Sequence, residues 1–359
     1  MRVRRRRMER QPQRQRRLTR PVISVGNLSV GGTGKSPVVA ALAQWLIEQG
    51  HTPSILSRGY ARADAVDGVV VVSDGRSILA GIDQSGDEPL MLARQVPGAI
   101  VCVSPDRFLS GTLAERQLGS TVHLLDDGFQ HLELARDLDI LVTTVGEIPN
   151  GRVIPAGRLR EPIDAAARAQ VLVVTDATAG AAKAEAWTLG ISQSCAAVRG
   201  LGEPTGIRDQ GSGIRDQGSG IRDQGSGIRE QGLGSRDQGR GIRDQKVLAV
   251  AGIAHPDRFV ASLKDAGWDV VDAVTFGDHH RYSRSDLAAI VARASSSGAD
   301  VVFTTDKDAV RFEAVGELPL PFYRVPLTVQ FDPAAALFES VQAVLRPPFA
   351  RSGELRRGE

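Results

Sequence analysis

The chain contains little cysteine, few aromatic residues and no long hydrophobic run. Its two cysteines, Cys102 and Cys195, have no paired spacing, which excludes a disulfide framework and a cysteine zinc site and is typical of a reducing compartment. No run of 18 apolar residues occurs, so we expect no membrane-spanning helix. Aromatic residues make up only 4% of the 359 residues, whereas 42% are hydrophobic. This composition suits α/β layers, and the length predicts about two domains.

Positive charge is concentrated at the N-terminus. Residues 1–20 contain ten arginines and one acid, Glu9, so this arm carries a formal charge of +9 and the rest of the chain −7. The arm lacks the apolar core of a secretory signal. It could attach to anionic lipid headgroups, contact nucleic acid nonspecifically, or be a disordered tail without a partner, and charge alone favours the tail.

Residues 22–37 read VISVGNLSVGGTGKSP, an apolar strand followed by a glycine-rich turn and the start of a helix. The phosphate-loop pattern G-x-x-x-x-G-K-[ST] departs from this sequence only at its first glycine. Backbone N–H groups of such a turn point at a phosphate, the lysine reaches the outer phosphates, and the serine hydroxyl can ligate Mg²⁺. We predict a nucleotide-triphosphate site formed by Ser29, Val30, Gly31, Gly32, Thr33, Gly34, Lys35 and Ser36.

Polar residues follow several predicted strands, at the sheet edge where open α/β folds bind ligands. Arg58 and Arg62 follow the strand at 52–56, where they could contact phosphate or lie solvated in a loop. Asp87 and Glu88 open a helix that continues to Gln95. Carboxylates there also have a structural explanation, because the helix dipole favours them by about 0.3–1 kcal/mol each.

The apolar strand at 121–125 runs into the motif DDGFQH. An aspartate such as Asp126 at the end of a core strand, in a chain with a phosphate loop, is typical of residues that hold Mg²⁺. We favour this function over a simple turn, which would explain Asp127 and Gly128 but not Gln130. His131 could take part or could bond a backbone carbonyl.

A rigid basic loop, PAGRLREP at residues 155–162, lies between the strands predicted at 139–143 and 171–175. Its two prolines bracket two arginines, which restricts the backbone around the charges. Such a loop would suit a phosphate or an acidic sugar.

From Gly206 the heptad GIRDQGS occurs six times with drift. One isoleucine and usually two glycines per repeat cannot sustain a coiled coil, because each glycine costs about 1 kcal/mol relative to alanine in a helix. We predict a flexible linker over residues 201–245.

A second alternation of strands and helices follows, with strands expected at 247–252, 268–276, 300–305 and 322–331 and helices at 256–266, 283–297 and 333–345. Alternation of this kind predicts a mostly parallel sheet covered on both faces. The predicted fold class is α/β: a P-loop NTPase-like α/β/α core domain over residues 21–200 and a smaller α/β domain over 246–345. The basic arm 1–20 and a tail at 346–359 flank them.

Two polar clusters follow strands of the smaller domain, at residues 278–280 and 304–308. His279 could be a metal ligand, an acid–base partner or a surface residue. Since no matching cysteine or histidine occurs elsewhere, a dedicated metal site is not expected.

Nine motifs, taken in order, resemble those of the tetraacyldisaccharide 4′-kinase family, which phosphorylates a lipid A precursor in Gram-negative bacteria. They are SVGNLSVGGTGKSP, SRGYAR, GDEP, the Arg107 segment, LDDGFQH, PAGRLREP, VAGIAHPDRF, FGDHHRYS and FTTDKDAVRF. The resemblance runs from about Pro21 to Leu345 and breaks only at the repeat, and the family tolerates serine at the place of Ser29. It implies transfer of the ATP γ-phosphate to the 4′-hydroxyl of tetraacyldisaccharide 1-phosphate, giving lipid IVA.

The resemblance also implies roles for individual residues. Lys35 and Ser36 would hold the phosphates and Mg²⁺. Asp87 would be the base that takes the proton of the attacking hydroxyl, with His279 paired to it. A histidine from the second lobe would couple catalysis to domain closure.

The remaining implied roles concern the metal and the substrate. Glu88 and Asp126 would lie near Mg²⁺. The residues expected to contact the substrate or the transferring phosphate are Asp127, Gln130, His131, Arg160 and Arg58.

Family members commonly begin with a hydrophobic segment that holds them at the inner membrane, whereas this chain begins with the arginine arm. We expect either peripheral attachment at the cytoplasmic face, where each basic residue near anionic headgroups adds about 1 kcal/mol, or a start that lacks the natural N-terminus. The expected partners are the lipid substrate and an anionic membrane surface, and we expect a monomer.

Two other function classes are less well supported. A regulatory GTPase would need a guanine-reading N-K-x-D segment, which is absent from the sequence. A nucleic-acid-binding ATPase predicts aromatic residues interleaved in the basic arm, and residues 1–20 contain none. We therefore expect no nucleic-acid partner.

Overall fold

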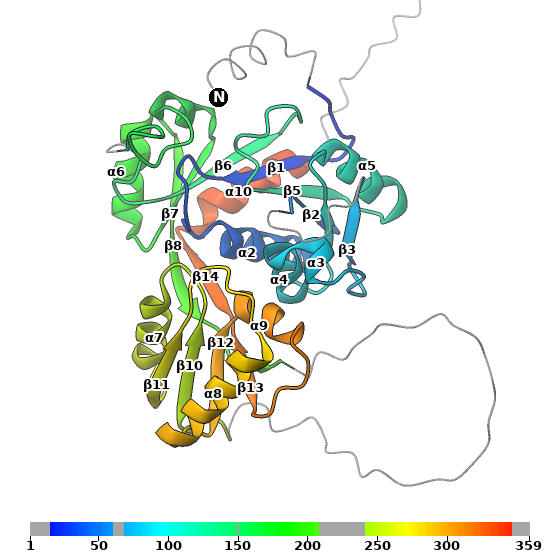
Figure 1. The fold of residues 1–359 in the computed structure, drawn as a ribbon. Helices are drawn as coiled ribbons and strands as arrows, with labels where there is room; N and C mark the ends of the chain where they lie inside the picture. Colours follow the sequence, from blue (N-terminus) through cyan, green and yellow to red (C-terminus); the bar gives the residue numbers. More distant parts are fainter. Residues whose placement is uncertain (1–14, 60–67, 149–150, 208–240, 347–359) are drawn as a thin grey trace, which may run out of the picture.

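The computed structural model describes residues 15–59, 68–148, 151–207 and 241–346. Within these ranges the chain forms two α/β lobes, each built on its own sheet (Figure 1). Residues 1–14 of the arm, Arg62, repeat residues 208–240 and the tail from 347 lie outside the described residues.

The large lobe contains a nine-stranded sheet in the order β14-β8-β7-β6-β1-β5-β2-β4-β3. Neighbouring strands are parallel, except that the edge strands β3 and β14 run antiparallel to β4 and β8. The strands are β1 (Val22–Gly26), β2 (Pro53–Ser57), β3 (Val70–Asp74), β4 (Ile100–Val103), β5 (Val122–Asp126), β6 (Leu138–Thr144), β7 (Val171–Thr175), β8 (Gln193–Leu201) and β14 (Leu327–Asp332).

Strand β1 lies between β5 and β6, so the chain reverses its direction of strand addition at the end of β1. Ligands of open α/β sheets bind at such a point, outside the carboxyl ends of the strands. The sheet is covered by α2 (Lys35–Glu48), α3 (Ile82–Ser85), α4 (Asp87–Gln95), α5 (Arg107–Gln117), the 3₁₀ helix η2 (Ile163–Arg168), α6 (Ala179–Leu189) and α10 (Ala334–Leu345). Burial on both faces explains why the central strands read as continuous apolar runs.

The small lobe contains a five-stranded sheet in the order β11-β10-β12-β13-β9. Its strands are parallel except for β9, which runs antiparallel to β13. The elements are β9 (Thr205–Gly206), β10 (Val247–Ala251), α7 (Pro256–Asp265), β11 (Val270–Thr275), α8 (Arg284–Ser297), β12 (Val301–Thr305), α9 (Asp306–Glu313) and β13 (Phe322–Val325).

The prediction of a single strand at 322–331 is wrong, because these residues form two strands in different sheets. β13 pairs with β12 in the small lobe, whereas β14 pairs antiparallel with β8 in the large lobe. Pro326 separates them, and proline cannot donate to a strand ladder.

The C-terminal helix also differs from the expected division, which placed residues 327–345 in the smaller domain. Helix α10 packs on the large lobe, where Trp45 of α2 stacks on Phe338 with ring centroids 4.5 Å apart. Leu337 and Val341 are fully buried in the large-lobe core. Apolar burial of these residues determines the lobe to which the helix belongs.

The arm and linker expected over 1–20 and 201–245 are partly ordered. Leu18 is buried beside Gly111, where any Cβ would lie 2.2 Å from Leu18 Cδ1. Arg16 pairs with Asp106, and Arg17 pairs with Asp137. The described end of the arm is therefore docked on the large lobe, and β9 likewise brings part of the expected linker into the small sheet.

Candidate active site

The glycine-rich turn after β1 is held by hydrogen bonds from Asn27, the residue after β1, and from Thr175 of β7. Asn27 Nδ2 donates to Thr33 Oγ1 at 3.0 Å, and Thr175 Oγ1 donates to the Thr33 carbonyl at 3.2 Å. Gly34 caps α2 with φ 83°, a left-handed conformation in which a Cβ would lie 3.2 Å from Thr175 Cγ2. Lys35 and Ser36 follow in the first turn of α2, as expected of a phosphate loop.

The basic loop PAGRLREP lies against this turn. Val30 N donates to the Arg158 carbonyl at 2.8 Å, and Arg160 N donates to the Leu28 carbonyl at 2.6 Å. The Arg158 guanidinium also donates to the Val30 carbonyl at 2.8 Å. Gly31 has φ 118°, a backbone conformation that L side chains rarely adopt, which explains a glycine at this place.

Two aspartates lie at the carboxyl end of β5, which ends at Asp126 and is followed by Asp127. Asp127 has φ 52°, and its carboxylate lies 2.7 Å from Arg160 Nη1 and 3.5 Å from Lys35 Nζ. Burial alone would raise the pKa of Asp127, but Lys35 and Arg160 bring it below its ordinary value. The structure thus groups Lys35, Asp127 and Arg160 within one ion network.

Asp126 is buried, and it interacts with the charge of Glu88 from α4. Burial first, and then the neighbouring carboxylates Glu88 and Asp127, raise the pKa of Asp126 to about 7. Convergent carboxylates of this kind repel one another and favour a bound cation. In the described part of the chain no three His, Cys, Asp or Glu side chains form a complete metal site. Mg²⁺ needs no such set, since it is commonly bound by one or two carboxylates together with substrate phosphates.

The other expected substrate residues surround this network. Gln130 Nε2 donates to the Asn27 carbonyl at 2.8 Å, and its Oε1 accepts from Arg160 at 3.2 Å. His131 is half-buried at the same turn. Arg58 is exposed just beyond the carboxyl end of β2.

Arg107, at the start of α5, lies near Asp126, although the sequence alone assigns it no role of its own. Its side chain is buried, and burial lowers its pKa to about 10 against the attraction of Asp126. The signal available in the sequence was an arginine directly after the helix cap Asp106, at the carboxyl end of β4.

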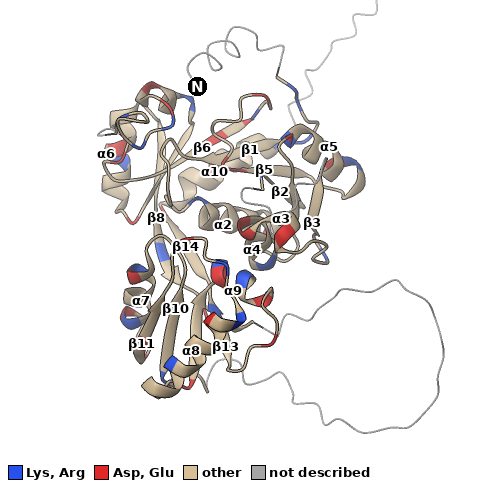
Figure 2. Cartoon of the chain, in the orientation of Figure 1, with Lys and Arg blue, Asp and Glu red and all other residues tan. Residues whose placement is uncertain are grey.

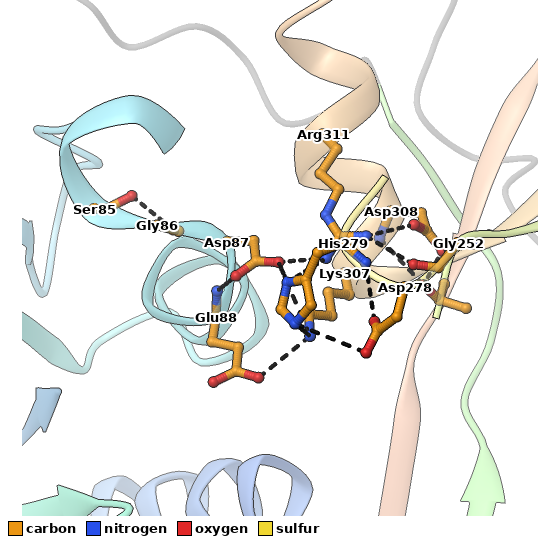
Figure 3. Close-up of polar contacts among 11 residues, drawn as sticks. Ser85, Gly86, Asp87, Glu88, Gly252, Asp278, His279, Lys307, Asp308 and Arg311 are labelled. Atoms are coloured by element: carbon orange, nitrogen blue, oxygen red, sulfur yellow. Dashed lines mark hydrogen bonds and ion pairs between the residues drawn. The ribbon is translucent and has the colours of Figure 1, made fainter. Parts of the chain in front are cut away.

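Asp87 and Glu88 begin α4 and face the small lobe (Figure 3). Asp87 Oδ1 accepts from the Glu88 backbone N–H at 2.9 Å, and Oδ2 lies 3.1 Å from His279 Nδ1. The ionised carboxylate accepts hydrogen bonds only, so Nδ1 of a neutral His279 carries the proton. The predicted pair of Asp87 and His279 is therefore brought together across the lobe boundary.

Two cations of α9 complete this cluster and were missed in the sequence analysis. Lys307 Nζ lies 3.3 Å from Glu88 Oε1 and 3.4 Å from His279 Nε2, and Arg311 bonds Asp87 Oδ2. Both belong to the motif FTTDKDAVRF, which covers the end of β12 and most of α9. Helical spacing alone does not indicate which of its cations reaches the other lobe.

The Asp87 cluster lies where charges of opposite sign on α4 and α9 meet (Figure 2). Burial alone would raise the pKa of Asp87, but Lys307, Arg311 and His279 bring it below its ordinary value. A cavity of about 200 Å³ opens beside it, lined by residues that include Ile82, Gly86, Asp87, His279, Arg281 and Arg311. The site therefore has a charged carboxylate next to space for a ligand.

Comparison with known proteins agrees with this geometry. A family model described as Tetraacyldisaccharide-1-P 4′-kinase matches residues 1–346. A tetraacyldisaccharide 4′-kinase of Geobacter sulfurreducens is 39% identical over 322 residues, which cover 89% of this chain and 82% of the relative. One from Pelobacter propionicus is 40% identical over 298 residues, which cover 82% of this chain and 75% of the relative.

A solved structure is similar as well: the "apo" form of LpxK from Aquifex aeolicus in complex with ATP. It is 26% identical, with a TM-score of 0.68, and the match covers 92% of this chain and 90% of that chain. This match confirms the predicted α/β fold with a P-loop NTPase-like core. The chain belongs to the tetraacyldisaccharide-1-P 4′-kinase family.

Proposed function

We propose that this chain performs the 4′-kinase reaction of its family with Asp87 as the general base. The family match confirms the predicted enzyme class, an ATP-dependent kinase of lipid A biosynthesis that phosphorylates tetraacyldisaccharide 1-phosphate. The 4′-hydroxyl oxygen attacks the γ-phosphorus, the bond from phosphorus to the bridging oxygen of ADP breaks, and Asp87 takes the hydroxyl proton. A positioned base of this kind contributes about 10²–10⁴-fold to rate.

The supporting observation for the base is the pairing of Asp87 with His279 beside the interlobe cavity. Asp87 is kept ionised by the surrounding cations, so it can accept a proton. His279 donates through Nδ1 and thereby orients the carboxylate. Because the two residues belong to different lobes, the pair is complete only when the lobes are apposed, which also excludes water from the transferring phosphate.

The phosphates of ATP would lie in the turn at residues 29–36, with Lys35 on the outer phosphates. ATP as the phosphate donor agrees with the ATP bound in the similar Aquifex structure. Ser36, Glu88 and Asp126 would hold Mg²⁺, which neutralises charge on the phosphates during transfer. The convergence of the buried Asp126 with Glu88 and Asp127 supports this cation site.

Arg160, Gln130 and Asp127 form one hydrogen-bonded group between the turn and the basic loop. We assign Arg160 to the transferring phosphate or the acceptor, because its guanidinium can neutralise phosphate charge. His131 and Arg58 lie at the same sheet edge and would contact the acceptor.

The lipid acceptor implies a membrane surface. None of the described helices is both long and apolar enough to cross a bilayer. We assign attachment at the cytoplasmic face of the inner membrane to the arginine arm, whose described end, Gln15–Arg20, is docked on the large lobe. Loss of vesicle binding on removing residues 1–14 would support this assignment, and unchanged binding to anionic vesicles would contradict it.

The decisive test is phosphate transfer from ATP to tetraacyldisaccharide 1-phosphate in detergent with Mg²⁺. Asp87→Asn removes the proton acceptor with little change in shape, and we expect kcat to fall by about 10²–10⁴-fold with ATP binding retained. The matched control is Asp265→Asn, which alters an exposed aspartate in the last turn of α7 and is expected to leave kcat unchanged. Full transfer by Asp87→Asn would refute the assignment of the base.

A further inference from the structure

Arg311 contacts Asp87 from the opposite lobe, and the function proposed above gives it no role beyond its positive charge. Its side chain is only 5% exposed. Nη2 donates to Asp87 Oδ2, and Nη1 donates to Asp308 Oδ1 at 3.0 Å and to the Gly252 carbonyl at 2.9 Å (Figure 3). The planar guanidinium thus joins the start of α4 to the small lobe.

The groups that hold Arg311 are themselves fixed. Asp308 is fully buried, and its Oδ2 accepts from Gly252 N at 2.9 Å and from Thr305 Oγ1 at 2.7 Å. A Cβ on Gly252 would lie 3.0 Å from Asp308 Oδ1, so the close approach of this backbone requires glycine. The guanidinium is consequently anchored at the carboxyl ends of β10 and β12.

His279 is held less rigidly than Arg311, so it orients the carboxylate of Asp87 less firmly than Arg311 does. Its side chain is 41% exposed, and its backbone is left-handed with φ 61°. Arg311, by contrast, lies on α9 next to Val310, which is buried in the large-lobe core. The helix that carries the guanidinium is therefore packed against the lobe that carries Asp87.

We propose that Arg311 is a positioning residue for phosphoryl transfer, which holds the carboxylate of Asp87 in the orientation that receives the acceptor proton. Asp308 and Gly252 in turn hold the guanidinium. The inference rests on the proposed role of Asp87 as the base. A fork with two Nη groups can bond Asp87 and Asp308 together, whereas a lysine ammonium acts as a point charge.

The interface offers a matched control. Arg94 on α4 forms an ion pair with Glu313 on α9, so it also joins the two lobes. Within the described residues it forms no hydrogen bond or ion pair with Asp87. Arg94→Ala removes a half-buried interlobe guanidinium without altering the base. A purely structural role of Arg311 predicts the same kinetic effect from both substitutions.

The test compares Arg311→Ala, Arg311→Lys and Arg94→Ala in the full chain by transfer kinetics and thermal unfolding. For Arg311→Ala we expect kcat to fall about 100-fold, since a misplacement of about 1 Å costs this much, while KM for ATP stays within about twofold. Millimolar guanidinium should restore part of the kcat of Arg311→Ala and have no effect on Arg94→Ala. Arg311→Lys should recover only a fraction of the lost rate.

A second variant keeps the proposal testable if Arg311→Ala fails to fold. Asp308→Asn preserves shape and removes the charge that holds the guanidinium, and we expect a kcat loss of about tenfold. Normal kcat in folded Arg311→Ala or Asp308→Asn, with Asp87→Asn inactive, would overturn the role of Arg311 alone. Normal kcat in Asp87→Asn would instead overturn the base on which the role depends.

Discussion

Asp87 and His279 are 192 residues apart in the sequence, and the carboxylate Oδ2 of one lies 3.1 Å from Nδ1 of the other. Asp87 begins a helix of the large lobe, and His279 follows β11 in the small lobe. Their contact exists only when the two sheet edges face each other. Proton acceptance and lobe apposition are therefore linked in one pair of side chains.

The left-handed backbone at Gly34 is required at the phosphate turn. We predict that Gly34→Ala weakens ATP binding at least about tenfold, because alanine at φ 83° costs about 1–2 kcal/mol and its Cβ meets Thr175. Gly50→Ala is the control, since φ there is 82° with nothing within 4 Å of a Cβ. Titration calorimetry should show an unchanged ATP affinity for Gly50→Ala; equal losses in both variants would contradict the argument.

Asp126 is expected to govern the response to Mg²⁺. Asp126→Asn should raise the Mg²⁺ concentration for half-maximal transfer about tenfold or more, because an amide is a weaker ligand than a carboxylate. Asp74→Asn is a suitable comparison, since Asp74 accepts from backbone N–H groups of a turn. A Mg²⁺ titration that is identical for Asp126→Asn and the unchanged chain would argue against a role in metal binding.

His123 is expected to make stability depend on pH. It is fully buried, with Nε2 3.0 Å from Glu115 and Nδ1 2.6 Å from Ser54, and burial lowers its pKa below the ordinary value of 6.5. Below pH 6.5 His123 is protonated in the unfolded chain but stays neutral in the folded chain until a lower pH. The free energy of unfolding therefore falls as pH falls.

Urea unfolding at about pH 7.5 and about pH 5.5 measures this loss. His123→Gln should reduce the pH dependence, because glutamine does not titrate. Greater stability of the unchanged chain at the lower pH would show that the imidazolium, rather than the neutral ring, is favoured by folding.

Helix α10 is expected to stabilise the large lobe, although it lies at the far end of the chain. Leu337→Ala should lower the free energy of unfolding by about 2–5 kcal/mol, the usual cost of emptying a buried leucine site. Glu339→Ala on the exposed side of the helix serves as the control. If Leu337→Ala left the unfolding transition unchanged, the packing of α10 on the nine-stranded sheet would be in doubt.

The phosphate turn could be predicted from the sequence because its physics is local. A buried strand, positive-φ glycine, lysine and serine occur within fifteen residues, and each acts through its own backbone or immediate neighbours. The parallel strands were likewise visible as apolar runs. Pro326 is a local signal against one continuous strand over 322–331, since proline cannot donate to a strand ladder, and the residues on its two sides pair in different sheets.

Other features depend on contacts between distant parts of the chain. The sheet to which β14 pairs, the lobe on which α10 packs and the cation of α9 that reaches Asp87 all follow from long-range burial and register. Arg311 and Arg324 are both arginines of the small lobe, yet Arg311 crosses the boundary to Asp87, while Arg324 pairs with Asp306 of its own lobe. Residue type and local spacing set which chemistry is available, whereas the packing of the two sheets against each other selects the side chains that meet.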